Sequence, residues 1–186
     1  MSTHMSREVQ SLQIADGGKV LTLNYADALT AHGGESWFGV AVGFRMLQAT
    51  GEALSQQRLW DRNDLFVLSG HPGGGVRDVI EYVTRCVTRK RFRVESGNTE
   101  SGCRRGMRFA WEVGDGVSVA MTRLRDGFVP EELYVLLDRR RTPAERTHDD
   151  RNFAALKRRL AQRVWDEPLA QLFNVDRVQA GVVGHA

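Results

Sequence analysis

The chain has 186 residues, which is enough for one domain with a hydrophobic core but too few for two full domains. None of its apolar runs reaches the roughly 18 residues of a membrane-spanning helix, so we expect no membrane partner. The net charge of +3 is only mildly basic, and nucleic acid is therefore not an expected partner.

The N-terminal region gives weak structural signals. We interpret residues 1–18 as a tail that is at most partly ordered, and because it lacks an apolar signal region we expect a cytoplasmic protein. A short strand is predicted over residues 19–23. A helix follows that begins at Tyr25, with Asn24 as its N-cap residue, and that stops at Gly33.

A second, longer helix is predicted from about Ser36 to Leu54. Apolar residues occur on both of its long faces, so most of the helix should be buried. Gly39 and Gly43 lie four residues apart on one face, where the lack of side chains lets another backbone approach closely. Either a dense helix core or close packing in a dimer would explain this pair.

The centre of the chain is a glycine-rich loop, Ser-Gly-His-Pro-Gly-Gly-Gly, at residues 69–75. An apolar strand over residues 65–69 leads into it, and an amphipathic helix is predicted from Val76 to Thr88. Such a loop presents free backbone N–H groups at the positive end of the helix dipole, which suits an anion, a metal-bound oxygen or a tight packing contact. The glycines expected to make this contact are Gly73, Gly74 and Gly75.

The second half of the chain predicts a β-hairpin, two long helices and a closing strand. The segment after Pro130 is read as a helix to about Arg140, with a strand over residues 134–137 as the alternative. The other expected elements are a hairpin over residues 107–124 that turns at 114–116, a helix from Asp149, a short helix over 168–172 and a strand over 173–178.

Together these elements indicate the α+β class, with an antiparallel or mixed sheet packed against several helices. We expect a single domain over residues 19–180, followed by a short tail at residues 181–186.

Two histidines lie beside glycines and are candidates for chemistry. His32 and His71 each suit a catalytic role, a metal ligand or an anion contact, or alternatively a hydrogen bond to loop backbone. Ser36 and Arg45 add a hydroxyl and a guanidinium for cofactor binding, although Arg45 also suits a surface or an interface. Cys86 lies on the apolar stripe of its predicted helix, where a buried thiol is the alternative to a metal ligand.

Three segments carry a family resemblance. Residues 32–39 read His-Gly-Gly-Glu-Ser-Trp-Phe-Gly, residues 40–45 read Val-Ala-Val-Gly-Phe-Arg, and residues 75–86 read Gly-Val-Arg-Asp-Val-Ile-Glu-Tyr-Val-Thr-Arg-Cys. In this order they resemble the FmdE-like domain family of formylmethanofuran dehydrogenase. That family carries His-Gly-His-x-Cys-Pro-Gly, a helix ending near Gly-Tyr-Arg, and then Cys-x-x-Asp-x-Ile-Gln before Thr-Gly-Cys-Thr. The resemblance covers about residues 25–178.

The resemblance implies an α+β core, often dimeric, with a metal near the histidine and cysteine motifs. This chain keeps the family residue types at His32, Asp78 and Cys86. Three other family positions, one histidine and two cysteines, are occupied here by Gly34, Ser36 and Gly75. His71 lies outside the family pattern and is the candidate substitute. The predicted ligands for zinc or another transition metal are therefore His32, His71 and Cys86.

Three functions are consistent with these features. The resemblance implies an accessory protein, or a metal- or small-ligand-binding protein, of one-carbon or molybdoenzyme metabolism that acts as a homodimer. The first alternative is a small enzyme whose histidine-containing pocket takes an anionic or one-carbon substrate. The second is a non-catalytic module that binds an anion or a cofactor. The sequence leaves open whether the chain is an enzyme.

Overall fold

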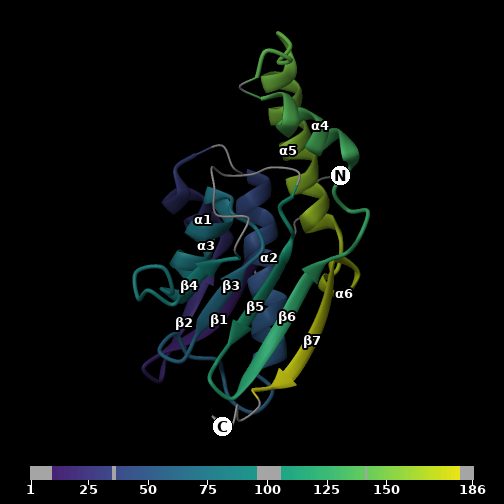
Figure 1. Cartoon of the computed structure of the whole chain (residues 1–186). Coiled ribbons are helices and arrows are strands. Elements are labelled where there is room, and N and C mark those ends of the chain that lie inside the picture. The colour runs from purple at the N-terminus through teal and green to yellow at the C-terminus, as the bar shows by residue number, and fades with distance from the viewer. Residues whose placement is uncertain (1–9, 35–36, 96–105, 141, 181–186) are drawn as a thin grey trace.

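The computed structural model describes residues 10–34, 37–95, 106–140 and 142–180. Within them the chain is α+β, as expected (Figure 1). None of the helices in these ranges has the length and apolar character that a membrane span requires. In chain order the elements are β1 (Ser11–Asp16), β2 (Lys19–Asn24), α1 (Tyr25–His32), α2 (Trp37–Leu54), β3 (Phe66–Ser69), α3 (Gly74–Thr84), β4 (Phe92–Val94), β5 (Ala110–Gly114), β6 (Ser118–Leu124), α4 (Glu131–Arg139), α5 (Asp149–Asp166), α6 (Leu169–Leu172) and β7 (Phe173–Gln179).

The main sheet has five strands in the order β4-β3-β5-β6-β7, and β1 and β2 form a separate antiparallel hairpin. Strands β3 and β4 pair in parallel and are joined through α3, whereas all other neighbours in the main sheet are antiparallel. Figure 1 shows α2 running behind this sheet. The predicted hairpin over residues 107–124 is confirmed as β5 and β6, and the closing strand as β7.

Helix α2 is the centre of the core, and its two glycines face α3 of the same chain. A Cβ placed on Gly39 would lie 3.5 Å from the Cα of Gly75, and one on Gly43 would lie 3.4 Å from the Cα of Val76. The two helix backbones therefore touch with no side chain between them. Of the two explanations for these glycines, the structure shows the dense helix core.

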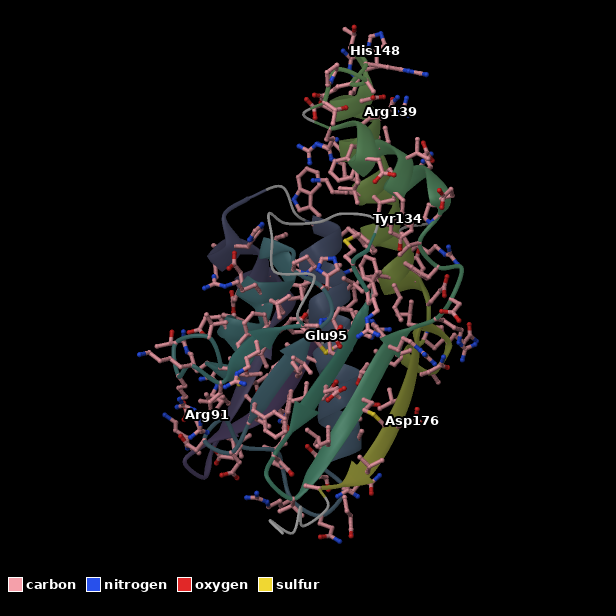
Figure 2. All side chains as sticks on the ribbon, in the orientation of Figure 1. Arg91, Glu95, Tyr134, Arg139, His148 and Asp176 are labelled. Carbon is pink, nitrogen blue, oxygen red and sulfur yellow. The ribbon has the colours of Figure 1, made fainter. Side chains whose placement is uncertain are left out.

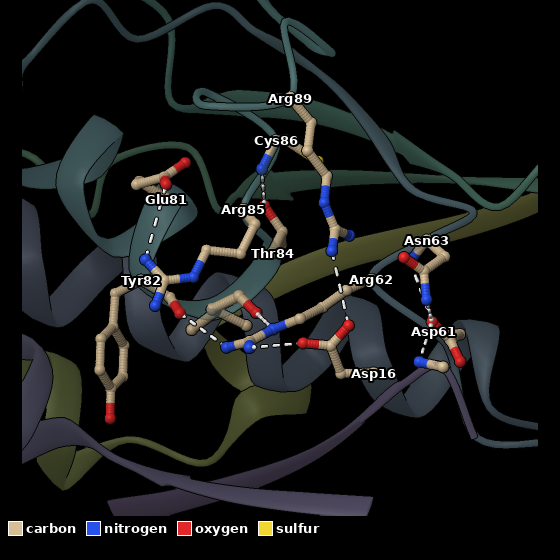
Figure 3. Close-up of polar contacts among 12 residues, drawn as sticks. Asp16, Asp61, Arg62, Asn63, Glu81, Tyr82, Thr84, Arg85, Cys86 and Arg89 are labelled. Atoms are coloured by element: carbon tan, nitrogen blue, oxygen red, sulfur yellow. Dashed lines mark hydrogen bonds and ion pairs between the residues drawn. The ribbon is translucent and has the colours of Figure 1, made fainter. Parts of the chain in front are cut away.

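Helix α3 ends earlier than expected, at Thr84 rather than Thr88. Arg85 adopts a left-handed conformation with φ of 60° and stops the helix. Arg62, which is 6% exposed, donates to the carbonyls of Tyr82 and Val83 at 2.9 and 2.7 Å, as Figure 3 shows. The last carbonyls of α3 are thus satisfied by a distant guanidinium, and the apolar periodicity that continues to Cys86 belongs to a buried turn.

The N-terminal tail expected over residues 1–18 contains strand β1. This strand is held by long-range contacts as well as by β2. The backbone N–H groups of Gly17 and Gly18 donate to the Asp61 carboxylate at 3.2 and 3.0 Å, and Trp60 Nε1 donates to the carbonyl of Gln13 at 2.6 Å. These partners lie more than 40 residues away, so local sequence signals could not reveal the strand.

Helices α4 and α5 form an arm that projects from the sheet (Figure 1). The helical interpretation of the segment after Pro130 is confirmed, and the alternative strand over residues 134–137 is wrong. Leu133 and Leu136 are buried, as are Phe153 and Leu156 of α5, which matches the apolar faces of two packed helices. The expected tail at residues 181–186 lies outside the described residues.

Candidate functional site

His32 and Asp78, which are 46 residues apart in sequence, form a hydrogen bond of 2.7 Å between Nδ1 and Oδ2. His32 is the last residue of α1, and Gly33 ends that helix in a left-handed conformation with φ of 64°. Asp78 lies on α3, which packs against α1. The predicted stop of α1 at Gly33 is therefore what places the imidazole against α3.

This contact fixes which nitrogen of the His32 ring carries the proton. An ionised carboxylate only accepts hydrogen bonds, so Nδ1 is the donor and Nε2 is left with a free lone pair in the neutral ring. A Cβ on Gly34 would lie 3.0 Å from Nε2, closer than most side chains come. The glycine thus leaves room for the ring, and Nε2 can act as a base or as a ligand.

Gly74, in the first turn of α3, lies on the same face of this helix as Asp78. Gly74 is exposed, and a Cβ added there would meet nothing within 4 Å. Because residues four apart in a helix share a face, Gly74 lies one turn from Asp78. Gly75 is instead buried against Gly39, so of the three glycines it has a packing role.

His71 is 4% exposed and lies between β3 and α3. Its Nδ1 accepts a hydrogen bond from the backbone N–H of Gly73 at 3.0 Å, and its ring lies 4.6 Å from Phe109 and 6.5 Å from Trp111. Burial lowers the pKa of His71 to about 4, so the ring is neutral near pH 7 with its proton on Nε2. His71 is therefore a hydrogen-bond donor through Nε2 rather than a base.

Two of the predicted metal ligands, Cys86 and His71, are not brought together. Cys86 follows the C-terminal end of α3, whereas His71 precedes the N-terminal end of this helix of 11 residues, about 16 Å long. The Cys86 thiol lies 3.5 Å from the carbonyl of Leu65 as a donor, and burial raises its pKa. Among the described residues, no group of three His, Cys, Asp or Glu side chains could hold a metal ion.

Arg45 also lies away from the glycine loop. Its guanidinium donates to Gln48 Oε1 at 3.0 Å and to the carbonyl of Glu167 at 2.7 Å, on the side of α2 that faces α5 and α6. Ser36, the other predicted cofactor-binding side chain, lies outside the described residues.

Sequence reasoning did not place Asp78 or Trp111 at the site. Asp78 matched the family motif, and that match was the available signal for its role. Trp111 is 1% exposed and its Nε1 has no hydrogen-bond partner. The hairpin prediction covered Trp111 but could not reveal its position beside His71.

Comparison with protein-family models finds no match to this chain. No curated protein matches its sequence either.

Proposed function

We propose that this chain is a divergent relative of the FmdE-like component of formylmethanofuran dehydrogenase and that it binds a small anionic ligand at His32. In this proposal it serves one-carbon or molybdoenzyme metabolism as an accessory protein, in the cytoplasm and as a homodimer. The observation that carries the proposal is the 2.7 Å hydrogen bond between His32 Nδ1 and Asp78 Oδ2. It joins two of the residues that keep the family residue types, His32 from the segment 32–39 and Asp78 from the segment 75–86.

The described residues suit an anion better than a zinc ion. Zinc usually takes three or four protein ligands, whereas among the described residues no group of three His, Cys, Asp or Glu side chains forms at this corner. An acid that binds here can pass its proton to Nε2, and the resulting imidazolium then lies between the ligand anion and Asp78. The backbone N–H of Gly74, which is exposed in the first turn of α3 and lies one turn before Asp78, adds a donor at the positive end of the helix dipole.

The same geometry favours one alternative, a small enzyme in which His32 is the general base. A carboxylate that holds a histidine through Nδ1 and leaves Nε2 free is the arrangement used to orient catalytic imidazoles. In that case His32→Ala would abolish turnover of an anionic or one-carbon substrate.

Titration with sodium formate, followed by amide NMR spectra, tests anion binding directly. We expect formate to shift the amide signals of Gly34 and Gly74, and His32→Ala to remove these shifts. The matched control is His148→Ala, since His148 is exposed at the far end of the α4–α5 arm (Figure 2). Shifts that persist in His32→Ala, or no shifts at all, would contradict the proposal.

Metal analysis of protein purified without an affinity tag separates anion binding from metal handling. The anion proposal predicts no stoichiometric zinc or iron, even after metal has been added and the excess removed. Stoichiometric metal that is lost in His32→Ala but kept in His148→Ala would instead assign the chain to metal handling.

A further inference from the structure

A groove of about 450 Å³ lies between the β1–β2 hairpin, α2 and α6, away from the His32 corner. Its volume is in the range of small-molecule sites in proteins. Leu12, Leu59 and Leu169 give it apolar walls, and Arg45 and Glu52 of α2 are its charged residues. The groove therefore combines apolar walls and uncharged polar side chains with a cation and an anion at separate places.

Arg45 lines this groove and is 5% exposed. Of its five guanidinium N–H groups, one donates to Gln48 and one to the carbonyl of Glu167, and the buried Nε has no partner. Within residues 10–34, 37–95, 106–140 and 142–180, no carboxylate lies within ion-pair distance of the guanidinium. A buried cation without a carboxylate in direct contact is costly: burial lowers the pKa of Arg45, and the charge of Glu52 offsets only part of this shift.

The guanidinium of Arg45 also contacts an aromatic ring of α5. Its Cζ atom lies 5.3 Å from the ring centre of Trp165. Gln48 and the carbonyl of Glu167, at the C-terminal end of α5, each accept from one N–H group of Arg45, and Nε is left without a partner. Arg45 therefore brings an unused hydrogen-bond donor to the cationic end of the groove.

The charges of the groove select the class of anion. Glu52 lies seven residues after Arg45 on α2, about 10 Å along the helix axis, and its negative charge disfavours a dianion such as phosphate. A single guanidinium matches one carboxylate in a two-point contact. We propose that this groove binds a small monocarboxylic acid with a compact apolar body, its carboxylate paired with Arg45 and its body against the leucines.

Amide NMR titrations with benzoate, benzamide and inorganic phosphate test this proposal on the unmodified protein. We expect benzoate to shift the amides of Leu12, Thr22 and Gly51, which line the groove. Benzamide has the same ring without the charge, so it and phosphate should leave these signals unchanged. No shifts with benzoate, or equal shifts with benzamide or phosphate, would overturn the proposal.

Substitutions test the role of each charge. Arg45→Met should weaken benzoate binding at least tenfold, whereas Arg151→Met on the exposed surface of α5 should leave it unchanged. If Arg45→Met fails to fold, Glu52→Gln gives an independent test, because Glu52 is exposed. Removing its charge should tighten benzoate binding about twofold, and unchanged binding would contradict the proposal. His32→Ala should keep benzoate binding, so this proposal and the formate site fail separately.

Discussion

The ring Nδ1 of His71 accepts a hydrogen bond from the backbone N–H of Gly73, two residues later, at 3.0 Å. Ser69 supports the same turn, because its hydroxyl accepts from the His71 N–H at 3.1 Å and donates to the His71 carbonyl at 2.9 Å. A protonated ring would lose the acceptor at Nδ1 and bring a charge into a site beside Phe109. The folded state therefore requires a neutral His71.

The free energy of unfolding should therefore decrease as the pH is lowered through the titration range of His71. Burial lowers its pKa from 6.5 to about 4 in the folded state, so between these values the unfolded chain binds a proton that the folded chain excludes. The stabilisation is complete above about pH 6.5 and is lost as the pH falls to about 4, a loss of about 3 kcal/mol. Urea denaturation at several pH values should show this loss.

The carboxylates also titrate in this range, so a variant is needed to isolate the imidazole. His71→Asn keeps an acceptor for the Gly73 N–H but cannot gain a proton. We expect its free energy of unfolding to decline less steeply between pH 6.5 and 4 than that of the native chain. Parallel pH profiles for the two proteins would show that His71 is not the titrating group.

Arg62→Met should destabilise the fold by about 3 kcal/mol, because it leaves the carbonyls of Tyr82 and Val83 at the end of α3 without their donor and removes one of the two arginines that pair with Asp16. Figure 3 shows Arg62 inside this group of partners. Arg58→Met is the control, because Arg58 also pairs with an aspartate, at 2.8 Å, but is mostly exposed. Chemical denaturation should separate the two variants, and equal stabilities would contradict the capping role.

The sequence predicted elements whose signals are local. Helix α2, the β5–β6 hairpin and the α4–α5 arm follow from apolar periodicity, turn residues and helix-start residues. The end of α3 could not be predicted in this way, because Arg62 caps it from about 20 residues away. Strand β1 depends in the same way on contacts with Trp60 and Asp61.

The candidate site was predictable only as a set of residue types. Motif resemblance singled out His32 and Asp78, but their contact depends on how α1 and α3 pack. The resemblance made Cys86 a candidate ligand, but the apolar stripe that contains it continues past the end of α3, and the thiol is buried in the core. Sequence spacing could not show that His71 lies at the other end of this helix.

Two glycines of α2 should respond differently to alanine. A Cβ at Gly51 would lie 2.9 Å from Cζ2 of Trp60, a ring that is 2% exposed and held by its hydrogen bond to Gln13. Gly51→Ala should therefore destabilise the fold by about 2 kcal/mol. At Gly39 the nearest atom is 3.5 Å away, an ordinary contact, so Gly39→Ala should change stability by less than about 1 kcal/mol. Thermal unfolding of both variants checks the contrast.

Asp78→Asn should weaken formate binding about tenfold or more while leaving the fold intact. The amide can donate to Nδ1 of His32, which favours the ring form with its proton on Nε2, and the carboxylate that stabilises an imidazolium is gone. Stability should change little, because Asp78 is 38% exposed. Formate titration by NMR gives the affinity, and denaturation gives the stability.

Asp64→Asn is the matched control, since it removes another aspartate from a surface ion pair and lies outside the His32 corner. Formate affinity should be unchanged in Asp64→Asn and reduced in Asp78→Asn. If Asp78→Asn binds formate as tightly as the native chain, the carboxylate does not act through His32, and the anion must be held by the first turn of α3 alone.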